Sequence, residues 1–141
     1  ELKLKRCLAH SRMLSSDVNA AFDPLYSDVF KNNSSSFLGS GVVFNKFTGS
    51  RGKSGSNDAN AEYLAVLRNI MDNHNVHFQM SELGKVDAGG GGTIAYIMSL
   101  YGMEVIDCGV AVLNMHAPWE VTSKADIYET YKCYKAFLKN A

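Results

Sequence analysis

The hydrophobic pattern of the chain switches several times between the helical and the strand period. Apolar residues at helical spacing predict four helices, over residues 2–10, 58–75, 94–101 and 124–138. Asn57 or Asp58 can cap the second helix, and Gly102 follows the third as a C-terminal stop. Ser123 is the predicted N-cap of the last helix, with Asp126 three residues on in a variant of the capping box.

Apolar and β-branched runs between these helices predict strands over residues 13–17, 41–47, 76–80, 105–107 and 110–113. The polar segment 23–36, the Gly/Ser/Lys-rich segment 48–56 and the glycine-rich segment 87–93 are predicted loops. Because helices separate the strands, this order predicts an α/β fold with a mixed, largely parallel sheet and helices on both faces.

Composition narrows the classes of function. The chain has 141 residues, with 14 Lys and Arg against 14 Asp and Glu, so its formal net charge is zero. That balance argues against a nucleic-acid partner, which usually requires a basic face. No apolar run is long enough to cross a bilayer, so we expect no membrane partner either.

Cysteine usage indicates the redox compartment, and the first residues indicate that the chain is part of a longer protein. Cys7, Cys108 and Cys133 form no C-x-x-C pair, which favours reduced, mostly buried thiols and a cytoplasmic location. The chain begins at Glu1 rather than Met and starts within an apparent element. We therefore expect it to be part of a longer protein.

Two glycine-containing segments invite a phosphate-binding interpretation. Gly52-Lys53-Ser54 resembles the end of a Walker motif, but the pattern needs a glycine where Phe47 stands, and the helix begins too late. We interpret this segment as a basic loop, either solvated or facing a substrate. Gly89–Gly92, which include Gly91 and Gly92, precede a helix, where backbone N–H groups can receive an anion or a carbonyl oxygen. Four glycines are also simply a flexible turn, and the signal alone is weak.

Asp17 and His116 are the most informative polar residues. Asp17 closes one predicted strand and His116 follows another, and the two are 99 residues apart in sequence. Because the carboxyl ends of strands form the ligand-binding edge of an open α/β sheet, they could meet there. Carboxylate and imidazole ligands suit zinc, and also cobalt or manganese. A capped turn and a surface histidine are the alternative.

Four stretches carry a resemblance to a known family: Ser16-Asp17-Val18, residues 48–62, residues 82–93 and Met115-His116-Ala117-Pro118-Trp119-Glu120. Together they resemble the C-terminal part of M18-family metalloaminopeptidases, nearest to the bacterial enzymes related to aminopeptidase I and aspartyl aminopeptidase. The resemblance extends over essentially the whole chain.

The resemblance implies a cytoplasmic zinc exopeptidase that releases N-terminal amino acids from peptides with a water activated by two zinc ions. Asp17 matches the aspartate that binds one ion, and His116 the histidine that binds the other. The general-base glutamate and the other ligands are expected upstream, outside this chain. Residues 1–141 would then be the C-terminal part of the catalytic domain, without its upstream part and the inserted β-rich domain.

The resemblance also suggests substrate contacts and an assembly. Lys46 stands next to the position of a substrate-binding lysine, and Gly91 and Gly92 are further candidate contacts. Ala20 replaces a substrate-contacting histidine of aspartyl aminopeptidases, so a preference for acidic residues stays open. Family members form homo-oligomers, commonly dodecamers. The alternative is a catalytically incompetent fragment with an assembly or structural role, and the chain on its own is predicted to be inactive.

Overall fold

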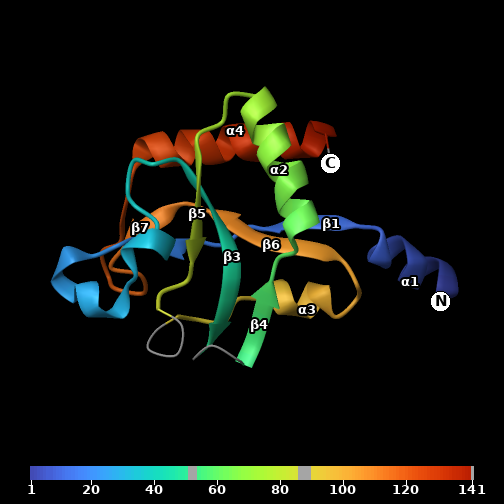
Figure 1. The fold of residues 1–141 in the computed structure, drawn as a ribbon, viewed down its shortest axis with the longest axis horizontal. Coiled ribbons are helices and arrows are strands. Elements are labelled where there is room, and N and C mark those ends of the chain that lie inside the picture. Colours follow the sequence, from blue (N-terminus) through green and yellow to red (C-terminus); the bar gives the residue numbers. More distant parts are fainter. Residues whose placement is uncertain (51–53, 86–89, 141) are drawn as a thin grey trace.

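The computed structural model describes residues 1–50, 54–85 and 90–140. Within these residues a mixed five-stranded sheet forms the centre of the molecule (Figure 1). Its strands are β1 (Arg12–Ser15), β3 (Val42–Ser50), β4 (Ser54–Asp58), β5 (Phe78–Glu82) and β6 (Glu104–Gly109). β6 lies between β1 and β3, while β4 and β5 both pair with β3.

A smaller sheet continues from the first. It contains β2 (Asn19–Ala20), β7 (Ala111–Leu113) and β8 (Val121–Thr122), in the order β2-β7-β8. Parallel pairing joins β1 to β6, β3 to β5 and β2 to β7, and antiparallel pairing joins β3 to β4, β3 to β6 and β7 to β8. The predicted mixed sheet is confirmed, and its parallel and antiparallel pairs are equally frequent among the described strands rather than largely parallel.

Helices lie on both faces of the larger sheet, as predicted. The α-helices are α1 (Leu2–Ala9), α2 (Ala61–Asn73), α3 (Ala95–Ser99) and α4 (Lys124–Asn140), with 3₁₀ turns over Pro24–Val29 and Asn32–Ser34. α2 and α4 cover one face, and α3 lies beside β4 and β6 on the other (Figure 1). α1 is exposed throughout most of its length and has no buried residue. No described helix has the length and apolarity needed to cross a membrane.

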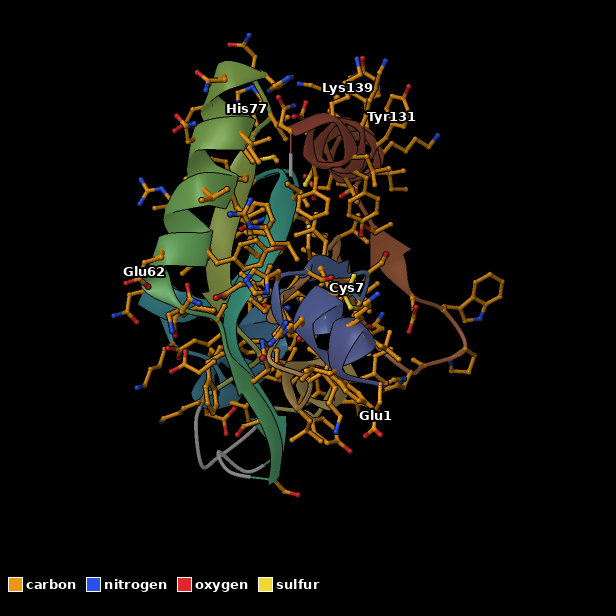
Figure 2. All side chains as sticks on the ribbon, turned by 90° about the vertical axis from the view of Figure 1, so that its right-hand side faces the viewer. Glu1, Cys7, Glu62, His77, Tyr131 and Lys139 are labelled. Atoms are coloured by element: carbon orange, nitrogen blue, oxygen red, sulfur yellow. The ribbon has the colours of Figure 1, made fainter. Side chains whose placement is uncertain are left out.

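The hydrophobic core lies between the larger sheet and the α2–α4 layer. Alternation along the strands sends Phe44 of β3 and Ile106 of β6 into this layer, where both are fully buried. Leu67 and Met71 of α2 and Phe137 of α4 complete it at helical spacing. Figure 2 shows α4 end-on, with Tyr131 and Lys139 on the side away from the sheet.

The described residues of the segment 48–56 belong to strands, contrary to the prediction of a loop. Thr48–Ser50 extend β3 and Ser54–Ser56 begin β4, so the two strands form an antiparallel hairpin arm. Gly, Ser and Lys residues are poor strand formers, but cross-strand hydrogen bonds override that weak propensity here. The residues 51–53 between them, including Lys53 of the basic segment, lie outside the described residues.

The predicted cap of the second helix is wrong, whereas Ser123 directly precedes α4, as predicted. Asn57 and Asp58 belong to β4, and the N-cap of α2 is Asn60, whose side chain accepts the N–H of Tyr63 at 2.7 Å. Asp126 uses its carboxylate for tertiary contacts rather than for a capping box.

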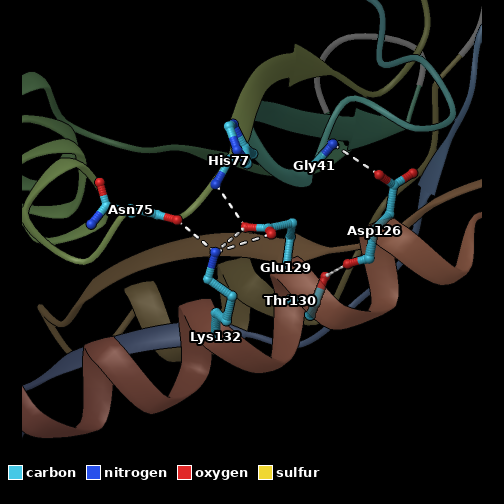
Figure 3. A network of polar contacts seen from close by, with 7 residues as sticks. All are labelled: Gly41, Asn75, His77, Asp126, Glu129, Thr130 and Lys132. Carbon is cyan, nitrogen blue, oxygen red and sulfur yellow. Dashed lines mark hydrogen bonds and ion pairs between the residues drawn. The ribbon is translucent and has the colours of Figure 1, made fainter.

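The Asp126 side chain is fully buried and joins α4 to the turn before β3. Its two oxygens accept the N–H groups of Gly39 and Gly41 at 2.7 and 2.8 Å. Figure 3 shows the bond to Gly41. The polar segment 23–36 likewise contributes buried groups, because Ser36 is fully buried against Asn19. The polarity of segment 23–36 therefore did not predict that Ser36 is buried.

Cysteine positions agree in part with the expectation of reduced, mostly buried thiols. Cys108 and Cys133 are free and fully buried, with their sulfur atoms 3.7 Å apart, whereas Cys7 on α1 is exposed. Burial raises the pKa of the Cys108 thiol, so this sulfur stays protonated at neutral pH.

Candidate metal and substrate site

Asp17 lies two residues beyond the end of β1 and is half-buried. Its Oδ1 accepts the N–H of Val18 at 2.8 Å. The residue lines a cavity of about 240 Å³ together with Gly109 and Tyr134. One oxygen of the carboxylate is fixed by the backbone, so the other can meet a ligand.

The backbone around Asp17 is tightly packed. A Cβ atom on Gly109 would lie 2.0 Å from the Asp17 carbonyl oxygen, so only glycine permits this approach of β6 to the Asp17 turn. Tyr134 of α4 donates its hydroxyl to the Cys108 carbonyl at 2.7 Å, and Ser16 Oγ lies 2.8 Å from the same hydroxyl. Burial raises the pKa of Tyr134 to about 12, which keeps this hydroxyl neutral.

His116 lies three residues beyond β7 in an exposed turn. It has a positive φ of 69°, and its N–H donates to Glu120 Oε1 at 2.7 Å. The side chain lines a cavity of about 260 Å³ whose other walls are mostly apolar. These walls are Ala20, Val29, Phe30, Leu83, Gly84, Gly90, Gly91 and Met115.

The structure places Asp17 and His116 after strands of different sheets, β1 and β7. They line separate cavities, and no hydrogen bond or ion pair joins their side chains within the described residues. The two parallel strands that were expected to bring them to one edge are therefore not neighbours in a single sheet.

The donor atoms fit zinc in kind. Zinc takes carboxylate oxygen and imidazole nitrogen, and Asp17 and His116 offer one group of each type. Across residues 1–50, 54–85 and 90–140, no group of three or more His, Cys, Asp or Glu side chains could hold a metal ion. The described part of the chain thus offers two ligands of the right type and no complete coordination shell.

The candidate substrate contacts divide into two groups. Gly91 lines the His116 cavity, and Gly92 follows it at the surface. Gly90 has a φ of +91°, and a Cβ there would lie 2.6 Å from the Leu83 carbonyl oxygen, so this turn depends on glycine. Residues 87–89 of the predicted glycine loop lie outside the described residues.

Lys46 lies elsewhere. Its ammonium group pairs with the Asp58 carboxylate across the β3–β4 arm, and it lines neither of the two cavities described above. The neighbouring Asn45 is buried and accepts a hydrogen bond from the Asn19 amide. Lys46 therefore keeps its role as a substrate contact only as a prediction.

Asp107 is a buried acid that the sequence pattern did not single out. It stands in β6 inside the apolar run Val105–Cys108 and is fully buried. Its Oδ2 accepts hydrogen bonds from Thr48 at 3.0 Å and from Thr93 at 2.7 Å. Burial raises the pKa of its carboxyl group, and the bonds from the two threonines oppose that rise. A charged residue inside an apolar strand is the signal that could have found it.

Comparison with known proteins identifies the family. The family model described as aminopeptidase I zinc metalloprotease (M18) matches residues 1–138. A probable M18 family aminopeptidase 1 from Clostridium acetobutylicum is 66% identical over 140 residues, which are 99% of this chain and 30% of the relative. The chain belongs to the M18 family of aminopeptidases.

Solved structures agree with this assignment. The crystal structure of aminopeptidase I from Clostridium acetobutylicum matches with a TM-score of 0.90 at 67% identity, over 98% of this chain and 30% of that one. The M18 aminopeptidase from Thermotoga maritima matches with a TM-score of 0.92 at 44% identity, over 99% and 31%. The chain therefore spans about 30% of the length of the relatives it matches. Its placement as the C-terminal part of a catalytic domain stays a prediction.

Proposed function

We propose that this chain contributes part of the active site of an M18 zinc aminopeptidase, with Asp17 as a ligand of one zinc ion and His116 as a ligand of the other. The observation that carries the proposal is the family match over residues 1–138, which includes both motifs. The remaining ligands and the general-base glutamate would come from the rest of the polypeptide.

The chemistry divides between the metal and the chain. When bound, zinc would supply Lewis-acid activation of the water that attacks the first peptide bond. This chain would contribute the two donors and a backbone that holds Asp17 in place. Gly109 fixes the Asp17 turn, and the bond from Val18 N–H leaves the second carboxylate oxygen free to bind. Cobalt or manganese would accept the same donors.

The His116 cavity is the proposed place for the N-terminal side chain of a peptide. Its lining of Ala20, Phe30, Leu83 and Met115 carries no charge, and Gly91 offers backbone for polar contacts. Among the described residues that line this cavity, an acidic side chain would lose its hydration without meeting a Lys or Arg side chain. We therefore propose that uncharged N-terminal residues are preferred, and Ala20 in place of a polar residue supports this preference.

The proposal also covers the cellular location and the oligomeric state of the enzyme. Two of the three thiols are buried and free, which supports a reducing, cytoplasmic location. Leu100 and Tyr101 beside α3 are 79% and 54% exposed, and apolar surface of this kind supports association into a homo-oligomer, such as the expected dodecamer.

Activity of a full-length polypeptide that contains this chain tests the proposal. We expect Asp17→Ala and His116→Ala each to lower kcat/KM on aminoacyl p-nitroanilides by at least about a hundredfold, because even groups that only support a metal ligand are worth 10–100-fold. Asp72→Ala and His77→Ala change exposed residues of the same types and serve as controls. Near-normal hydrolysis by either site variant would refute the assignment.

The alternative role, an assembly fragment without catalysis, predicts a different outcome in the same assay. In that case no polypeptide carrying this chain hydrolyses the substrates, and neither site variant changes the result.

A further inference from the structure

Asp107 lies on the sheet face opposite the main core. Its neighbours Ile106 and Cys108 belong to the core beneath α2 and α4, so alternation along β6 turns Asp107 toward the α3 side. Figure 1 shows α3 beside β6 on that side of the sheet. A fully buried acid therefore stands below the segment that leads into α3.

The carboxylate holds this segment directly. Thr93 donates to Asp107 Oδ2 at 2.7 Å, and Thr48 of β3 donates to the same oxygen at 3.0 Å. Thr93 follows Gly90–Gly92, which we call the glycine turn. Because Gly91 lines the His116 cavity, the bond from Thr93 fixes the far end of a cavity wall.

Asp107 is also the centre of a buried polar row that crosses three strands. Its register partners are Ser15 of β1 and Asn45 of β3, and both are buried. Ser15 Oγ, Asn45 Nδ2 and Asp107 Oδ1 form no hydrogen bond of standard geometry among the described residues, although the Ser15 hydroxyl lies near enough to Asp107 to act to lower the pKa of its carboxyl group. Buried polar atoms left in this state destabilise a fold, and they need an explanation that packing does not give.

The row links the two candidate regions of the site. Ser15 is the last residue of β1, two positions before Asp17, while Thr93 directly follows the glycine turn. An apolar residue at position 107 would allow the same strand pairing but could not accept the hydrogen bonds of Thr48 and Thr93. The polar row can therefore fix the position of Thr93, which a row of apolar side chains could not do.

We propose that Asp107 is a positioning residue of the peptidase site, which holds the glycine turn through Thr93 in the geometry that receives the substrate. This inference rests on the proposed aminopeptidase function. Because the turn contacts the substrate before and during reaction, loosening it weakens binding in both states and acts mainly on KM.

Steady-state kinetics of a full-length polypeptide containing this chain, with leucine p-nitroanilide as the substrate, test the role. We expect Thr93→Val, which removes the hydroxyl at nearly constant shape, to raise KM about tenfold with kcat within about twofold. Thr93→Ser keeps the hydroxyl and is expected to restore KM. A general packing role for Thr93 would not be rescued in this way.

A double-mutant cycle checks that the effect passes through the acid. Asp107→Asn keeps an oxygen that both threonines can reach, so we expect KM within about threefold of the parent. Asp107→Ala should raise KM as Thr93→Val does, and adding Thr93→Val to it should change KM little further. If Asp107→Ala does not fold, the Thr93 pair and Asp107→Asn still decide the question.

The outcomes separate this inference from the proposed function. An unchanged KM in Thr93→Val, a loss confined to kcat, or failure of Thr93→Ser to restore KM overturns the positioning role alone, provided that the parent is active and Asp17→Ala is not. A parent polypeptide that fails to hydrolyse the substrate, or an active Asp17→Ala variant, overturns the proposed function and this inference with it.

Discussion

Gly109 shows how one residue's size can govern a candidate metal ligand. β6 passes so close to the Asp17 turn that the Asp17 carbonyl oxygen occupies the space of a side chain. Since the Asp17 carboxylate is attached to the same backbone, a shift of the Asp17 carbonyl group also moves the carboxylate.

Gly109→Ala is therefore expected to shift the Asp17 turn and to lower kcat/KM of the full-length enzyme by about ten- to a hundredfold. A backbone atom would meet the new methyl group at 2.0 Å, so a side-chain rearrangement cannot relieve the contact. Kinetic assays together with circular dichroism, which shows whether the variant is folded, would measure the effect. Unchanged kcat/KM in a folded Gly109→Ala variant would contradict the coupling of Gly109 to Asp17.

At the residue scale, the sequence predicted the candidate ligands Asp17 and His116 but not the buried acid Asp107. Asp17 and His116 could be selected because each follows an apolar strand. Asp107 could not, because its partners Thr48 and Thr93 are 59 and 14 residues away and no local pattern connects them. The cap of α2 was misassigned for a related reason: Asn57 is a good cap by type, and only its pairing with Thr48 in the hairpin excludes it.

At the scale of elements, α4 anchors two turns of the sheet through charged side chains. Besides Asp126, Glu129 accepts the N–H of His77 at 2.8 Å, and Lys132 contacts both Glu129 oxygens at 3.0 Å (Figure 3). Burial acts to raise the pKa of Glu129, but the bonds from His77 and Lys132 outweigh it and lower the pKa below its usual value. The helix thus gains stability from the ionised form.

This shift fixes the direction of a pH effect. A carboxyl group whose pKa is lowered by folding stabilises the protein above its unfolded-state pKa, and the contribution is lost as pH falls through the folded-state pKa. The ordinary Glu value is 4.5, so the contribution is complete at neutral pH and declines below that value.

We expect Glu129→Gln to lower Tm by a few degrees at pH 7, with the difference shrinking as pH falls below about 4. Differential scanning calorimetry across this range would measure it. Glu62→Gln at the exposed start of α2 is the matched control. A Tm difference that stays constant down to acid pH would show that Glu129 acts through packing rather than charge.

Elements were predicted better than their ends and pairings. Helical periodicity located α2 and α4 because both bury one stripe of apolar residues against the sheet. The β3–β4 arm was missed because its Gly- and Ser-rich strands have no apolar alternation and depend on pairing with each other. The two-sheet arrangement, which separates the strands preceding Asp17 and His116, is likewise a matter of long-range pairing.

At the scale of the whole molecule, the chain has its own core but matches only part of the length of its relatives. It spans about 30% of the relatives it matches, and its described residues offer two candidate zinc ligands on separate cavities. In the proposed enzyme each ligand serves a different ion, so each substitution should remove one ion preferentially and leave the fold intact.

Zinc stoichiometry of the purified full-length polypeptide is the most direct measurement of this claim. We predict two zinc ions per polypeptide in the parent, and a loss of about one ion in Asp17→Ala and in His116→Ala under the same conditions. Two ions retained at parental affinity in both variants would show that neither residue is a ligand, and the account of this chain as part of a di-zinc site would be wrong.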